Sequence, residues 1–130
     1  MKGSVVVKRT AGPSYVGETL SGTVRFEGSD ASPMDTLAAS LGGCLAITIS
    51  SILQTMRQPL NDIEVRLTYE KQEERPRVFV HFKVDLVLRG EKLSHERVER
   101  AVQLAEEIYC PVSVMLQRAG VKIDTSFTLE

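Results

Sequence analysis

Apolar and polar side chains alternate along several stretches of the chain, a pattern typical of β-strands with one buried face. In residues 63–70 the apolar positions are Ile63, Val65, Leu67 and Tyr69. In residues 78–88 the positions expected on one buried face are Val80, Phe82, Val84, Leu86 and Leu88. The charged stretch 71–77 between them predicts a hairpin-like connection. Further strands are predicted over residues 4–9, 14–20, 23–27 and 121–129.

A long apolar segment between these strands carries the signals of a helix. Ser32 is a favourable N-cap, and Pro33 suits the first helical position. Asp35 lies in the first turn, where the helix dipole favours a carboxylate. Because Pro59 cannot continue a helix, the segment predicts a helix over residues 33–57.

Two shorter helices are predicted in the C-terminal half of the chain. Ser94 caps the first, over residues 95–108, and Cys110 caps the second, in which Pro111 takes the first position. Strands, a helix, a hairpin, two helices and a final strand predict an α+β fold. Since no linker divides the chain, we expect residues 1–130 to form a single domain.

The central helix has no polar face, so it must be covered on every side. Small residues on one face would let a second helix approach closely; they are Ala39, Gly42, Gly43, Ala46 and Ser50. This favours an obligate homodimer in which the two central helices lie near a shared core. The alternative is a monomer whose helix packs tightly against a sheet, which also suits small residues.

The central segment also requires a membrane test, because residues 36–56 contain no charge over about the length of a spanning helix. Its hydroxyl and amide side chains, its glycine pair and the lack of aromatic anchors favour a helix buried in a soluble protein. Three valines followed at once by charges do not make a signal peptide. We therefore expect a cytoplasmic location with no membrane partner.

Composition narrows the possible partners. The chain is 42% hydrophobic and 25% charged with a formal net charge of -1, so no basic surface for nucleic acid is expected. Two cysteines are too few for a closed zinc site, and neither His81 nor His95 has ligand spacing to them. No metal or cofactor is predicted. In a reducing compartment the two cysteines are expected to be free thiols or a transient, chemically active pair.

The two cysteines differ in their local sequence. Cys44 lies inside the apolar helix, where a lone cysteine usually behaves as a small hydrophobe. Cys110 stands at a predicted helix N-terminus, where backbone amides lower a thiol pKa from its usual value of about 8.5. The alternative is that Cys110 only caps the helix. On the residues alone, Cys110 is the better candidate nucleophile.

Four short motifs, in order, resemble the OsmC/Ohr hydroperoxide reductases. They are residues 25–28 (RFEG), Pro33, residues 37–44 (LAASLGGC) and residues 110–113 (CPVS). The order of predicted strands and helices matches that family over nearly the whole chain. The Leu-Gly-Gly-Cys sequence resembles the OsmC-like branch more closely than Ohr.

The resemblance implies an OsmC-like fold, with antiparallel sheets around a buried central helix. It also implies an intertwined homodimer with its active sites at the subunit interface. Cys44 corresponds to the family's peroxidatic cysteine and Cys110 to its resolving cysteine. Arg25 corresponds to the arginine that pairs with the reactive thiolate and the peroxide. The implied reaction is reduction of organic hydroperoxides, with no cofactor and with a lipoyl-type dithiol as the reductant.

The sequence departs from the family at Met34, where members carry a glutamate bonded to the arginine. Asp35, the next residue, is the candidate replacement, although it projects about 100° further round the helix. The departure favours an alternative function, in which an OsmC-like fold binds a small ligand or senses redox state without turnover.

Overall fold

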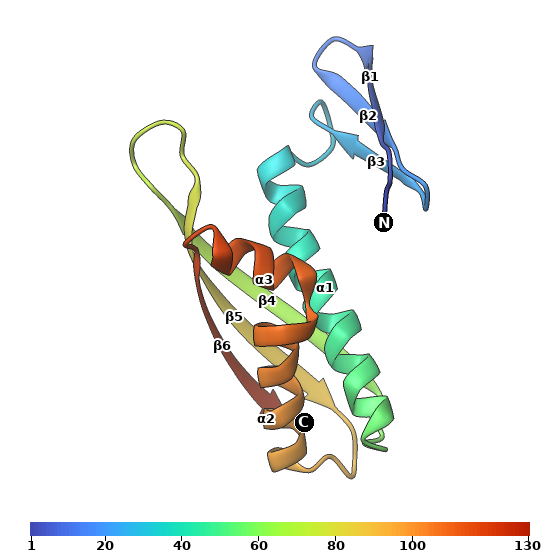
Figure 1. The fold of residues 1–130 in the computed structure, drawn as a ribbon, viewed down its shortest axis with the longest axis vertical. Coiled ribbons are helices and arrows are strands. Elements are labelled where there is room, and N and C mark those ends of the chain that lie inside the picture. Colours follow the sequence, from blue (N-terminus) through green and yellow to red (C-terminus); the bar gives the residue numbers. More distant parts are fainter. The chain divides into compact units, whose positions relative to one another are not determined.

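The computed structural model describes all of residues 1–130 and divides them into two compact units (Figure 1). The first unit contains Met1–Ala39 and the second contains Ser40–Glu130. Each unit is described by itself below. Helix α1, Pro33–Thr55, begins in the first unit and continues into the second.

The first unit is a three-stranded antiparallel sheet. Strands β1 (Val6–Ala11), β2 (Ser14–Glu18) and β3 (Thr23–Phe26) pair in the order β1-β2-β3. Gly12, with φ of +52°, makes the tight turn between the first two strands, a conformation that favours glycine. Every residue of β1 is exposed, so this sheet has almost no core of its own.

Helix α1 starts as the sequence predicts. The backbone N–H of Asp35 donates to the Ser32 hydroxyl over 3.0 Å, which satisfies one of the free amides of the first turn. The helix ends at Thr55 rather than at Arg57. Arg57 adopts a positive φ of 58°, and the N–H of Gln58 donates back to the Leu53 carbonyl over 2.9 Å. This C-terminal motif closes the helix before Pro59 is reached.

The second unit contains a mixed sheet. Strands β4 (Asp62–Lys71), β5 (Phe79–Arg89) and β6 (Lys122–Leu129) pair in the order β4-β5-β6. The β4–β5 hairpin is antiparallel, but β6 runs parallel to β5, so the expectation of antiparallel sheets is wrong for this one pair. Residues 90–121, which contain the C-terminal helices described below, supply the long crossover that a parallel pair requires.

A bulge in the hairpin corrects one predicted core position. Glu70 pairs with His81 and Lys71 with Phe79, so Val80 is the unpaired residue. Phe79 is buried in its place, and Val80 is 40% exposed. The bulge shifts the side-chain alternation by one residue at this end of β5. Closer to the middle of the strand, Phe82, Val84, Leu86 and Leu88 are buried as predicted.

The C-terminal helical region is interrupted where one helix was expected up to Ile108. Helix α2 (His95–Leu104) passes into a π-helical turn, η1 (Ala105–Tyr109), before α3 (Pro111–Arg118) begins. Ser94 caps α2 as predicted, with its hydroxyl accepting from the N–H of Arg97. Helices α2 and α3 both contact β6, and together with α1 they lie along one face of the sheet (Figure 1).

One side of α1 forms the centre of the core of the second unit. Leu41, Leu45, Ile49 and Leu53 are fully buried at helical spacing. Gly42 is buried beside them, and a Cβ there would lie 2.8 Å from Leu67 Cδ1 on β4. At this position the small residue therefore serves packing of the helix against the sheet, the alternative considered for the small-residue face. By length and composition α1 could also cross a membrane, but it is the core helix of a soluble fold.

Candidate active site

Cys44 lies in the middle of α1, close in sequence to residues that anchor the helix in the core. Leu41 and Leu45, on either side of it, are both fully buried. Cys44 itself is half-buried and is a free thiol. The packing of α1 thus fixes the cysteine backbone while leaving part of its side chain open to a reactant.

Cys110 occupies the junction between the π turn and α3. It is the N-cap of α3, and Pro111 takes the first helical position, as the sequence predicts. Its backbone is extended, with φ of -87° and ψ of 105°, and its side chain is a free thiol with 0% exposure. Cys110 is therefore held in a tight turn and is shielded from solvent.

The structure brings the two cysteines together, and this contact changes the chemistry of Cys110. Burial, followed by a side-chain hydrogen bond with Cys44, raises the pKa of the Cys110 thiol from 9.0 to about 12. The amides of Ser113 and Val112 at the start of α3 act in the opposite direction, but they are outweighed. The helix N-terminus therefore acts in the predicted direction, but the expectation that the pKa of Cys110 is lowered overall is wrong. A buried thiol with a raised pKa suits a second, resolving thiol better than a first nucleophile.

The other two candidate residues lie in the first unit. Arg25 is an exposed residue of β3 and faces Val16 across the β2–β3 pair. Asp35 is exposed in the first turn of α1. Cys44 and Cys110 both lie in the second unit. The four candidate residues are thus divided between the two units. Only the two cysteines lie in the same unit as each other and in contact.

Sequence reasoning missed one polar residue beside Cys110. Ser113 is completely buried, and its hydroxyl donates to the Glu106 carbonyl over 2.8 Å. Gln117 donates to the same carbonyl over 2.9 Å. The Cys-Pro-Val-Ser motif contained Ser113, but its role was not visible because the acceptor belongs to the preceding helical turn.

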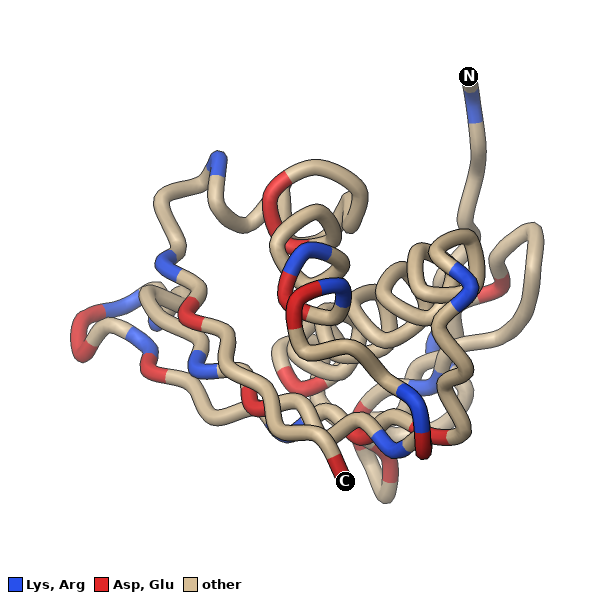
Figure 2. Tube along the Cα trace, turned by 90° about the horizontal axis from the view of Figure 1, so that it is seen from below, with Lys and Arg blue, Asp and Glu red and all other residues tan.

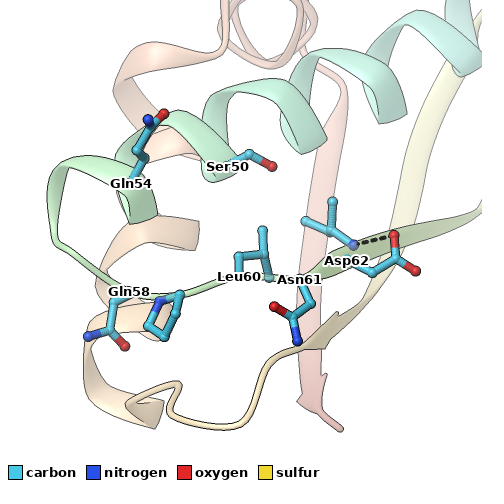
Figure 3. A pocket seen from close by; sticks show the side chains of 8 residues that line it. Ser50, Gln54, Gln58, Leu60, Asn61 and Asp62 are labelled. Carbon is cyan, nitrogen blue, oxygen red and sulfur yellow. Dashed lines mark hydrogen bonds between the residues drawn. The ribbon is translucent and has the colours of Figure 1, made fainter.

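A hollow of the second unit does not contain this chemistry. A cavity of about 540 Å³ lies where α1 leads into β4. Figure 3 shows Gln54, Gln58 and Asn61 around it, together with Asp62, whose carboxylate accepts from the N–H of Ile63. Neither cysteine lines this cavity, and the residues around it include no nucleophile activated by a base. We therefore assign the candidate site to the cysteine pair.

Known proteins of similar sequence and structure identify the family. The family model described as OsmC-like protein matches residues 26–126. Protein YhfA of Escherichia coli is 41% identical over 118 residues, which cover 87% of this chain and 88% of that protein. The crystal structure of an OsmC-like protein from Mycoplasma pneumoniae has a TM-score of 0.85 at 13% identity and covers 99% of this chain and 97% of its own.

A structure whose description names a function is also similar in fold. It is an organic hydroperoxide resistance protein OsmC from Legionella pneumophila, with a TM-score of 0.68, 21% identity and 96% of each chain covered. That likeness shows the fold alone, whereas the family model spans most of the chain. The chain belongs to the OsmC-like protein family.

Proposed function

We propose that this protein reduces organic hydroperoxides to alcohols, with Cys44 as the peroxidatic thiol and Cys110 as the resolving thiol. The contact between these two cysteines is the observation that carries the proposal. Their different exposure supports the division of roles. Cys44 is half-buried and can meet a peroxide, while Cys110 is fully buried and can meet Cys44.

The reaction balances with these two thiols and one external dithiol. The Cys44 thiolate attacks the distal, OH-bearing oxygen of the peroxide, the O–O bond breaks, and the alkoxide takes a proton to leave as an alcohol. Cys44 is then a sulfenic acid. The Cys110 sulfur attacks it, forming a disulfide and releasing water. An external dithiol reduces the disulfide to two thiols and becomes a disulfide itself.

Arg25 is the proposed partner of the Cys44 thiolate. A guanidinium beside a thiolate favours the ionised sulfur and orients the peroxide. Asp35 is the proposed carboxylate that holds this arginine, in the place of the family glutamate that Met34 replaces. These two roles rest on the family resemblance.

The surroundings of Cys44 support an organic rather than an inorganic peroxide. Leucines flank the cysteine on the buried side of α1, and Ile47, one turn further, is 73% exposed. An apolar surface gains free energy when it removes an alkyl group from water. We further propose a homodimer in the cytoplasm and a lipoyl-type dithiol as the reductant, both in keeping with the family.

A thiol count tests the proposal. One equivalent of cumene hydroperoxide is expected to remove two thiols per chain, and an added dithiol is expected to restore both. Cys44→Ser should abolish peroxide consumption. Cys110→Ser should permit a single oxidation, after which Cys44 proceeds to sulfinic acid. If Cys110→Ser alone blocks the first oxidation, the two roles are reversed.

The second candidate is a redox sensor or ligand-binding protein without turnover, and two features favour it. Met34 removes the family carboxylate, and Cys110 has no exposed surface for an external dithiol to attack. Such a protein would form its disulfide once and recover slowly. Repeated additions of peroxide in the presence of excess dihydrolipoamide separate the two functions. Many turnovers per chain support the peroxidase, and a single turnover supports the sensor.

A further inference from the structure

The turn that carries Cys110 leaves one backbone carbonyl without a backbone partner. The N–H of Cys110 donates to the Ala105 carbonyl over 2.8 Å, one residue further back than in an α-helix. The Glu106 carbonyl thereby loses its α-helical donor. Its next possible donor, in π-helical spacing, is residue 111, and Pro111 has no N–H. A carbonyl at such a helix end needs a partner from elsewhere.

Two side chains of α3 supply that partner. The Ser113 hydroxyl donates to the Glu106 carbonyl over 2.8 Å, and the Gln117 amide donates to the same oxygen over 2.9 Å. The Gln117 amide also donates to the Ser113 hydroxyl over 2.9 Å. These three groups form a closed cluster, which we call the carbonyl clamp.

The carbonyl clamp spans Cys110 in the chain. Glu106 precedes the cysteine in the π turn, and Ser113 follows it in the first turn of α3. The Cys110 carbonyl accepts from the N–H of Val114 over 3.0 Å, so its backbone is held on both sides. The position of the cysteine thus depends on the angle between η1 and α3, which the clamp fixes.

We propose that Ser113 and Gln117 are positioning residues that hold the Cys110 sulfur within reach of Cys44 for disulfide formation. The inference rests on the proposed function of the two cysteines as a redox pair. Closure requires the Cys110 sulfur to attack in line with the leaving hydroxyl of the Cys44 sulfenic acid, with loss of water. A sulfur that wanders by about 1 Å loses much of the advantage of an intramolecular reaction.

Disulfide formation in dithiothreitol redox buffers tests this role without peroxide. Ser113→Ala removes the buried donor and is expected to lower the equilibrium constant for the Cys44–Cys110 disulfide by roughly tenfold or more. Gln117→Leu, at an exposed position, leaves the serine bond intact and should give a smaller reduction. Thr125→Val is the matched control, because Thr125 donates to the side chain of Glu106 over 2.7 Å and not to its carbonyl. The thermal stability of each reduced variant is measured in parallel.

The outcomes separate this inference from the proposed function. A lower disulfide constant in Ser113→Ala and Gln117→Leu, with Thr125→Val unchanged despite any loss of stability, supports the clamp. Equal effects in all three variants, or none in the first two, overturn it. If the wild-type protein forms no disulfide, both the clamp and the proposed function are wrong. If the clamp variants weaken the disulfide but the wild type fails to consume peroxide, the proposed function alone is wrong.

Discussion

Cys110 receives two opposing influences, and their relative size decides its chemistry. The amides at the start of α3 favour a thiolate, while burial and the neighbouring Cys44 thiol favour the protonated form. Burial wins, because an anion without solvent loses far more than two amides return. In the proposed reaction, a protonated Cys110 does not compete with Cys44 for peroxide, and it attacks only after the Cys44 sulfenic acid has formed next to it.

The raised pKa of Cys110 predicts how stability depends on pH. The thiol has a pKa of about 12 in the folded protein and 9.0 as its ordinary value, so its contribution is complete below about pH 9 and is lost as pH rises towards 12. Above pH 9 the unfolded chain ionises this thiol while the folded chain keeps it protonated. Urea unfolding of the reduced protein should show a decline of up to about 1.4 kcal/mol per pH unit that Cys110→Ser lacks. Parallel curves for the two proteins would refute the raised pKa.

Arg25 offers a second test at residue scale, since its proposed role is purely electrostatic. If its guanidinium lies beside Cys44 in the active protein, Arg25→Met should slow oxidation of Cys44 at neutral pH by roughly tenfold or more. Asp35→Asn should have a smaller effect in the same direction. The measurement is the pH profile of Cys44 alkylation in a Cys110→Ser background. Arg9→Met, on β1 at the opposite edge of the same sheet, is the control.

An Arg25→Met profile that overlays its parent would remove the arginine from the site. An unchanged Asp35→Asn profile, with Arg25→Met affected, would leave the arginine without this carboxylate. Slower alkylation in Arg9→Met as well would point to a general loss of positive charge in the sheet rather than to a specific pair.

At the scale of elements, the two adjacent glycines of α1 have opposite environments. A Cβ on Gly42 would meet Leu67 Cδ1 at 2.8 Å, whereas a Cβ on Gly43 meets nothing within 4 Å. Gly42→Ala should therefore destabilise the protein by about 1–3 kcal/mol, unless Leu67 moves aside. Gly43→Ala should stabilise the isolated chain by about 1 kcal/mol through helix propensity. Urea unfolding of the two variants gives the comparison, and equal effects would contradict this packing.

Local signals in the sequence predicted the starts of the helices, because caps and prolines act within a single turn. Ser32, Ser94 and Pro111 each stand where the structure begins a helix. The direction of β6 could not be predicted, since parallel and antiparallel strands share the same side-chain alternation. The bulge at Val80 and the π turn before Cys110 could not be predicted either, because neither changes the spacing of apolar residues in a recognisable way.

The candidate site was predicted only in part, because the sequence reveals local signals but not the contacts made by distant residues. The resemblance paired Cys44 with Cys110, and the structure places their thiols in contact. The sequence predicted the wrong direction for the pKa of Cys110, because a helix terminus is recognisable in the sequence and the burial of this side chain in the folded unit is not. Ser113 was missed because its partner carbonyl becomes free only when the chain adopts the π turn.

At the scale of the whole molecule, the distribution of charge does not indicate a partner surface, whereas the exposed apolar side chains do. Lysines and arginines are interspersed with acidic residues along the chain (Figure 2), in agreement with a net charge of -1. By contrast, Val6 and Val7 of β1 are 52% and 57% exposed, and Ile47 of α1 is 73% exposed. A small sheet with exposed valines and a core helix with one open side both favour a partner surface.

We therefore predict that this chain is a homodimer at micromolar concentration and that the open side of α1 contributes to its interface. Ile47→Asp places a charge on that side and should weaken association by at least about 1.5–3 kcal/mol, the transfer free energy of a buried isoleucine side chain. A dimer with a shared core couples folding to association, so the urea concentration at the midpoint of unfolding should fall as the protein is diluted. At a given protein concentration this midpoint should be lower for the variant than for the unmutated protein. Gln103→Glu, on the exposed side of α2, adds the same charge and should leave both properties unchanged. Sedimentation of the unmutated protein as a folded monomer would exclude the dimer. A dimer that Ile47→Asp does not weaken would move the interface away from α1.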